Sequence, residues 1–199
     1  RNEAIPINVY IGVDIAATAT QNSDFQVIMV IGVDSNKNRY ILEYYRERIP
    51  TFDLPEQIIK MARKYTPVRR VTIETVAAQE MVRDMVTRMA SEDRRLIPGI
   101  FKGVKPPPGI KKADRLETSL GPIVNSKKLY IRREMTELVD EMFEHPVPKN
   151  DDLMDGLYYA DYYSKAPLST AISVGEMRAG KKKGGKLRGY YNWMTGARR

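Results

Sequence analysis

The sequence predicts an α/β fold: a mixed sheet of five or more strands that begins with an antiparallel meander and carries helices on both faces. Two observations lead to this prediction. Three β-rich runs at the start of the chain, Asn8–Ala16, Phe25–Val33 and Arg39–Ile49, are joined by short polar connections, as antiparallel neighbours are. Beyond residue 50, stretches with helical spacing of apolar residues alternate with short β-rich runs, which is typical of strand–helix units.

The individual elements follow from local signals. Phe25–Val33 is almost wholly apolar, which is typical of a central strand buried on both faces. Asp53 is placed to cap a helix that has Pro55 in its first turn, and Val71–Thr75 is a short strand. Further helices are expected over Ala78–Ala90, Lys112–Leu120, Met135–Phe143 and Asp151–Tyr163, further strands over Leu96–Val104 and Leu129–Ile131, and a loop over Pro106–Gly109.

Composition excludes several classes of protein. The chain has 199 residues, of which 42% are hydrophobic and 29% charged, so it is long enough to bury a core. It has no cysteine, which excludes disulfides, thiolate metal sites and a cysteine nucleophile, and its single histidine excludes a multi-histidine zinc site. No apolar run is long enough to span a membrane. The chain starts at Arg1 without a signal-peptide pattern, so we expect a piece of a longer cytoplasmic protein.

The net charge of +8 lies in the C-terminal segment. Residues 165–199 hold 9 basic residues and one acid, whereas residues 1–164 hold 24 of each sign. We therefore expect one domain over 1–164 and a basic, flexible tail over 165–199. Within the domain, residues 102–133 hold 9 basic residues against two acids, and this local excess indicates a polyanionic partner.

Single acids stand at the ends of two apolar strands. Asp14 follows Val13 on the first strand, and Glu74 follows Ile73 on the fourth. A buried carboxylate without a partner is unfavourable, so such acids are expected to line a crevice or to hold a cation.

A third group of acids, Asp151, Asp152 and Asp155, opens the last helix. Acids in the first turn interact favourably with the helix macrodipole, and Asn150 or Asp151 could cap the helix. Both are purely structural roles. Asp155 fits that role less well, because it lies in the amphipathic body of the helix. The following Gly156 suggests close approach of another backbone. Oxygen ligands without cysteine favour Mg²⁺ or Mn²⁺ over zinc, and two such ions about 4 Å apart can support phosphodiester hydrolysis.

These features together carry a family resemblance. The IGVDIA strand, the later Ser23–Asp24, the VTIET strand, the KKADRLETSLGPIVNSKKLYI segment and the closing DDLMDGLYYA helix resemble, in this order, the nuclease domain of tailed-phage large terminases. The resemblance covers residues 8–163. It implies an RNase H/RuvC-like fold and an Mg²⁺- or Mn²⁺-dependent endonuclease that cuts concatemeric viral double-stranded DNA during packaging, with little sequence specificity.

The resemblance also assigns roles and partners. It carries Asp14 and Glu74 over as metal ligands of a two-metal site, with Asp151, Asp152 and Asp155 all candidates for the third acid. Gly156 is a departure, because the family often has alanine there. In the full-length protein the resemblance implies an upstream ATPase motor, a portal protein and a small terminase as partners, no membrane, and a location in the host cytoplasm.

The basic residues of the 102–115 region are candidates for DNA binding. Lys111, Lys112 and Arg115 open a helix after the proline-rich loop and could meet phosphates beside the acids, although a solvated helix face has the same pattern. Lys102 and Lys105 flank that loop. Three further groups are weaker candidates: His145 as a general base, and Thr18 and Asp24 as groups that orient metal-bound water.

Three alternatives remain open at this level. A junction resolvase would share the fold, and a DNA- or capsid-docking module would lack cleavage. An actin-like ATPase is disfavoured because no glycine-rich phosphate turn follows Asp14. The segment Gly175–Lys182 has phosphate-loop spacing, but too little chain follows it to build a nucleotide-binding fold.

Overall fold

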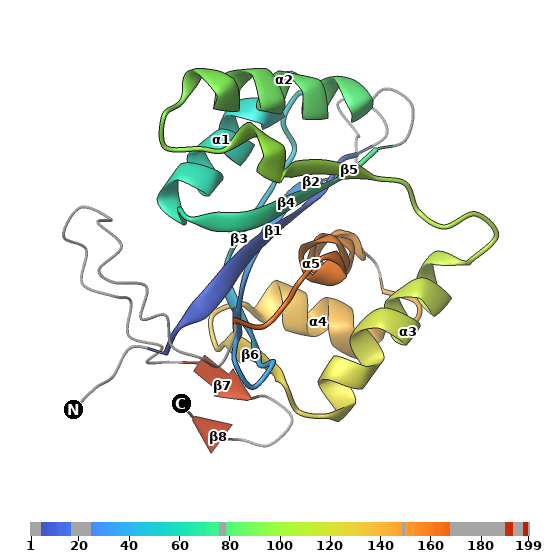
Figure 1. The fold of residues 1–199 in the computed structure, drawn as a ribbon. Helices are drawn as coiled ribbons and strands as arrows, with labels where there is room; N and C mark the ends of the chain where they lie inside the picture. Colours follow the sequence, from blue (N-terminus) through green and yellow to red (C-terminus); the bar gives the residue numbers. More distant parts are fainter. Residues whose placement is uncertain are drawn as a thin grey trace.

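The computed structural model describes residues 5–16, 25–75, 79–148, 150–167, 190–192 and 197–198. After an initial run of three strands, strands and helices alternate up to the fourth helix, and a fifth helix and two short strands follow (Figure 1). The strands are β1 (Ile7–Asp14), β2 (Gln26–Asp34), β3 (Arg39–Glu47), β4 (Val68–Glu74), β5 (Phe101–Val104), β6 (Leu129–Arg132), β7 (Tyr190–Asn192) and β8 (Ala197–Arg198). The helices are α1 (Leu54–Lys64), α2 (Glu80–Glu92), α3 (Lys112–Asn125), α4 (Thr136–Glu144) and α5 (Asp152–Tyr162), with a 3₁₀ turn at Pro98–Ile100.

The strands form one mixed sheet in the order β5-β4-β1-β2-β3-β6-β7-β8. The β1-β2-β3 meander is antiparallel, as the sequence predicted. β4 runs parallel to β1, β5 runs parallel to β4, and β6 runs parallel to β3. The predicted mixed sheet is therefore confirmed, and its two central strands are β2 and β3.

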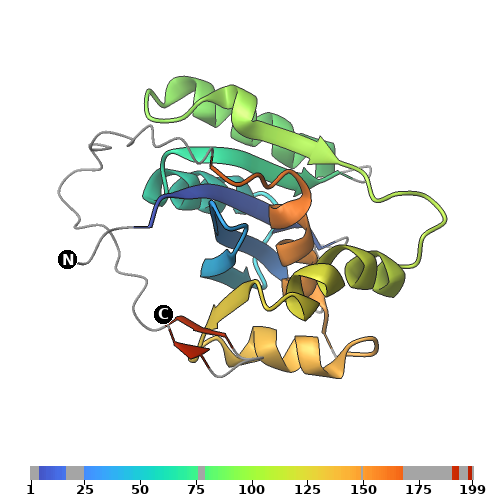
Figure 2. The same ribbon diagram turned by 60° about the horizontal axis from the view of Figure 1, so that its bottom comes forward.

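Helices cover both faces of this sheet, which divides the core into two layers (Figure 2). One layer lies between the sheet and α1 and α2, and the other lies between the sheet and α3, α4 and α5. Side chains of β2 alternate between the layers: Ile28 and Val30 face the first, whereas Val27, Met29 and Ile31 face the second. All nine residues of β2 are buried, which confirms the prediction of a strand covered on both faces.

The C-terminal segment adds two strands that the sequence analysis did not predict. β7 pairs antiparallel with β6, and β8 pairs with β7. Most of the predicted basic tail lies outside the described residues. Within the described part of the chain, no helix combines the length and hydropathy needed to cross a bilayer.

Helix α5 packs directly against β1 and β2 through two glycines. A Cβ atom on Gly12 would lie 2.2 Å from the carbonyl oxygen of Gly156 and 2.2 Å from the backbone nitrogen of Ala160. A Cβ atom on Gly156 would lie 2.7 Å from Cγ1 of Val27. The close approach that Gly156 suggested is therefore confirmed. Because side chains two apart on a strand share a face, Gly12 and Asp14 both face α5.

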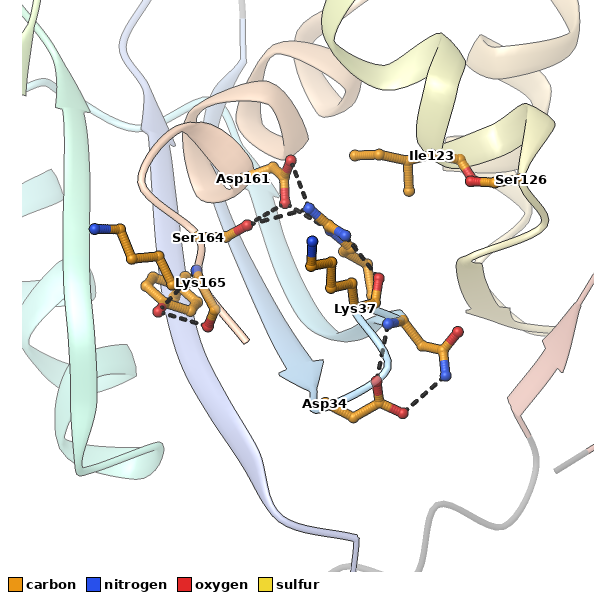
Figure 3. A network of polar contacts seen from close by, with 10 residues as sticks. Asp34, Lys37, Ile123, Ser126, Asp161, Ser164 and Lys165 are labelled. Atoms are coloured by element: carbon orange, nitrogen blue, oxygen red, sulfur yellow. Dashed lines mark hydrogen bonds and ion pairs between the residues drawn. The ribbon is translucent and has the colours of Figure 1, made fainter. Parts of the chain in front are cut away.

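The C-terminal end of α5 is tied to the sheet by polar contacts (Figure 3). Arg39 Nε on β3 donates to Asp161 Oδ1 at 2.9 Å. Tyr10 Oη on β1 donates to the carbonyl oxygen of Lys165 at 3.0 Å, and the side chain of Ser164 contacts Asp161. The position of α5 on the sheet is thus fixed by backbone contact at its centre and by side-chain contacts at its end.

Candidate active site

The ends of β1 and β4 bring two acids together. The two strands are parallel neighbours with Val13 opposite Ile73, so Asp14 and Glu74 follow side by side at the same edge. Parallel strands expose their carboxyl ends at one edge of a sheet, where ligands commonly bind. The structure therefore places the two acids beside each other at this edge of the sheet.

Asp155 completes a group of three carboxylates. It lies on the first turn of α5, directly before Gly156, and only 2% of its surface is exposed. Burial raises the pKa of Asp14 well above its ordinary value, and the hydrogen bond with Glu74 and repulsion from Asp155 raise it further. Burial also raises the pKa of Asp155, against the effect of two nearby basic side chains. Glu74 and Asp155 therefore both disfavour the ionised form of Asp14.

Two basic side chains of α3 lie against these acids. Lys112 Nζ contacts Asp151 Oδ1 at 2.7 Å and also contacts Asp155 Oδ2. Arg115 donates from Nη2 to Asp155 Oδ1 at 2.7 Å, and its guanidinium lies 4.8 Å from the centre of the Tyr158 ring. The structure thus brings Lys112 and Arg115 directly to the acidic group.

The other predicted basic residues precede Lys112 in the chain, on β5 or in the loop that leads to α3. Lys105 follows β5, and its Nζ lies 3.6 Å from Glu80 Oε1 on α2. Lys102 is exposed on β5, and exposed Lys111 directly precedes α3. These residues surround the loop between β5 and α3.

The structure sets one of the three acids at the start of α5 apart from the other two. Asp155 faces Asp14 and shares Lys112 with Asp151. Asp152 instead lies 3.5 Å from Arg46 Nη2 on β3. Arg46 also packs over the ring of Phe25, at 4.1 Å from its centre.

Glu141 on α4 caps α5 in place of the residues that the sequence suggested. Asp151 is the N-cap residue, but its side chain makes no capping hydrogen bond. Glu141 Oε2 instead accepts from the backbone N–H groups of Leu153 at 3.0 Å and Met154 at 3.2 Å. Glu141 and Arg46 escaped the sequence analysis, because nothing local distinguishes them from other charged residues. With the cap supplied from α4, the carboxylate of Asp151 is left to Lys112.

Among the residues that the structure describes, none of the remaining candidates from the sequence analysis is seen to join the acidic group. His145 follows α4, and its Nε2 atom is buried without a hydrogen-bond partner among the described residues. Thr18, Ser23, Asp24 and the segment Gly175–Lys182 lie outside the described residues.

The acidic group has the donor chemistry of a divalent-metal site. Asp14, Glu74 and Asp155 offer only oxygen ligands, which suit Mg²⁺ or Mn²⁺. The buried hydroxyl of Tyr159 lies beside Glu74, and burial and the charge of Glu74 both raise its pKa. No three acidic or histidine side chains among the described residues already form a coordination shell. The residue types therefore fit a metal, while basic side chains hold both oxygens of Asp155.

The strand order, with a meander followed by parallel strands and acids at the ends of β1 and β4, defines the RNase H-like class of fold. The chain belongs to the terminase RNase H-like domain family, whose model matches residues 11–160. This confirms both the predicted fold and the resemblance to terminases. The search of curated proteins gave no match.

Solved structures share the fold at low sequence identity. The large terminase nuclease from thermophilic phage G20c, with bound zinc, is 16% identical with a TM-score of 0.59, covering 82% of this chain and 86% of that one. A second structure of that nuclease is 14% identical with a TM-score of 0.55, covering 82% and 87%. The yeast mitochondrial Holliday junction resolvase is 12% identical with a TM-score of 0.51, covering 79% and 78%.

Proposed function

We propose that this domain is a divalent-metal-dependent endonuclease that cleaves double-stranded viral DNA during genome packaging. The convergence of Asp14, Glu74 and Asp155 beside Lys112 and Arg115 is the observation that carries the proposal. Membership of the terminase family supports the packaging role. By the same family argument, its partners would be an ATPase motor on the same polypeptide, a portal protein and a small terminase, in the host cytoplasm.

Asp14, Glu74 and Asp155 are the residues that would hold Mg²⁺ or Mn²⁺, with Asp151 adjacent. When bound, such ions activate water for attack on phosphorus and stabilise the charge that develops on the leaving oxygen. Asp152 contributes indirectly, because its partner Arg46 and the capping residue Glu141 hold the start of α5 in place.

The basic side chains supply contacts to the DNA backbone. Arg115 is well placed for a phosphate, because its guanidinium is held over Tyr158 and is already oriented. Lys102, Lys105 and Lys111 lie in the neighbouring segment, where they would add attraction without reading base sequence. Cleavage with little sequence specificity follows from this composition.

A plasmid-cleavage assay tests the proposal. The domain is incubated with supercoiled DNA in EDTA, Mg²⁺, Mn²⁺ or Ca²⁺, beside the variants Asp14→Asn and Asp140→Asn. Asp140 is an exposed acid on α4 and serves as the matched control. We expect cleavage in Mg²⁺ or Mn²⁺ that disappears with EDTA and with Asp14→Asn but persists with Asp140→Asn.

Two outcomes would contradict the proposal. Cleavage by Asp14→Asn at the wild-type rate would remove Asp14 from the site. DNA binding without cleavage in any of the metals would favour the docking-module alternative. The same assay on a four-way junction, compared with linear duplex, tests the resolvase alternative.

A further inference from the structure

The ammonium group of Lys112 contacts carboxylate oxygens that a bound metal ion would also need. It contacts Oδ1 of Asp151 and Oδ2 of Asp155, while Arg115 Nη2 contacts the other oxygen of Asp155. Both oxygens of this buried carboxylate are therefore bound to cationic side chains. An additional cation at Asp155 would be repelled strongly, because charges interact at short range there with little solvent screening.

The two basic residues differ in their freedom to move. The side chain of Arg115 is 9% exposed and packs over Tyr158 and Tyr159, whereas the side chain of Lys112 is 41% exposed. Lys112 also lies at the very start of α3, next to a loop, and its aliphatic stem has several rotatable bonds. Lys112 is therefore the cation that can leave the acidic group while Arg115 stays.

We propose that Lys112 is a positioning residue that holds Asp151 and Asp155 together in the metal-free domain and is displaced from Asp155 when a divalent cation binds. This inference rests on the proposed metal-dependent function. The lysine neutralises repulsion among the acids and keeps the site assembled before the metal arrives. Once displaced, its ammonium group is free beside the site, where a DNA phosphate can take the place of the carboxylates as its partner.

Metal affinity tests this competition with a readout separate from activity. Isothermal titration with Mn²⁺ is carried out on the wild-type domain, on Lys112→Met and on Lys111→Met. Lys111 is the matched control, since the substitution removes the same charge from the adjacent, exposed position. We expect Lys112→Met to bind Mn²⁺ about fivefold more tightly or better, the factor for losing a partly exposed competing ion pair, and Lys111→Met to stay near wild type.

The sign of the change separates this role from a merely structural one. If Lys112 only supported the fold of the site, Lys112→Met would bind Mn²⁺ more weakly or unchanged, and the proposal would be overturned. A gain of the same size in Lys111→Met would also overturn it, because the effect would then be one of general charge. Absence of Mn²⁺ binding in all three proteins would instead refute the proposed metal-dependent function, and this inference with it.

Amine acylation followed by mass spectrometry tests the displacement directly. The Lys112 amine should react slowly in the metal-free domain and faster at saturating Mn²⁺, whereas the reactivity of Lys111 should not change. An unchanged Lys112 rate at a metal concentration that titration shows to be saturating would mean that the ammonium stays on Asp155. That result would overturn the displacement and leave the proposed metal site intact.

Discussion

Replacing Gly12 by alanine would put a methyl group between β1 and the backbone of α5. The new Cβ would lie 2.2 Å from both the Gly156 oxygen and the Ala160 nitrogen, whereas ordinary contact begins at 3.4 Å. Neither atom can turn away as the end of a side chain could, because both belong to the helix backbone. To restore contact, α5 must move off the sheet by about 1.2 Å. We expect the free energy of unfolding to fall by about 3 kcal/mol, at the upper end of the overpacking range.

The same displacement would separate Asp155 from Asp14, since one lies on α5 and the other on β1. A misplacement of about 1 Å can reduce a catalysed rate about 100-fold. Guanidinium-induced unfolding measures the stability of Gly12→Ala, and plasmid cleavage measures its activity in conditions where the variant is folded.

Gly99→Ala is the matched control for this substitution. A Cβ atom at Gly99 would meet nothing within 4 Å, so we expect stability and cleavage close to wild type. Wild-type stability and cleavage in Gly12→Ala would show that α5 does not depend on this backbone contact, and would refute the account of how Asp155 is positioned.

Three further substitutions test other parts of the structure. Glu141→Ala leaves two N–H groups of α5 without their acceptor, so the free energy of unfolding measured by chemical denaturation should fall by about 2 kcal/mol. Tyr40→Phe removes a buried hydroxyl that donates to Asp34 at 3.0 Å, and we expect a loss of about 1.5–3 kcal/mol in the same assay. Burial alone would raise the pKa of Glu43, but hydrogen bonds with Lys64 and Tyr65 hold it below its usual 4.5. The Glu43 carboxylate therefore stabilises the fold at pH values above its usual pKa of 4.5, and this stabilisation is lost as the pH falls through its lower pKa in the folded protein. Glu43→Gln should lower Tm at pH 7, with a difference from wild type that shrinks in acid; a constant difference across the titration would contradict the assignment.

Much of the fold could be predicted because its signals are local. The apolar run of β2 and the turn residues after it required only strand period and turn chemistry. The position of Asp14 and Glu74 at the ends of apolar strands was visible for the same reason. Strands β7 and β8 were missed, because they are short and depend on pairing with β6, which a linear sequence does not reveal.

The sequence by itself determined which residue types the site contains: acids at two strand ends and at the start of the last helix, a glycine for close packing, and basic residues in the segment of α3. Only the tertiary structure decided which of these acids lie together at the strand ends and which pair with other residues. Asp155 faces Asp14 while Asp152 faces Arg46, because residues three positions apart on a helix point about 60° apart and lie about 4.5 Å apart along its axis. The side chain of α5 that reaches the strand ends is chosen by the contact of α5 with Gly12 and by the cap from Glu141. Both interactions join residues more than ten positions apart in the sequence.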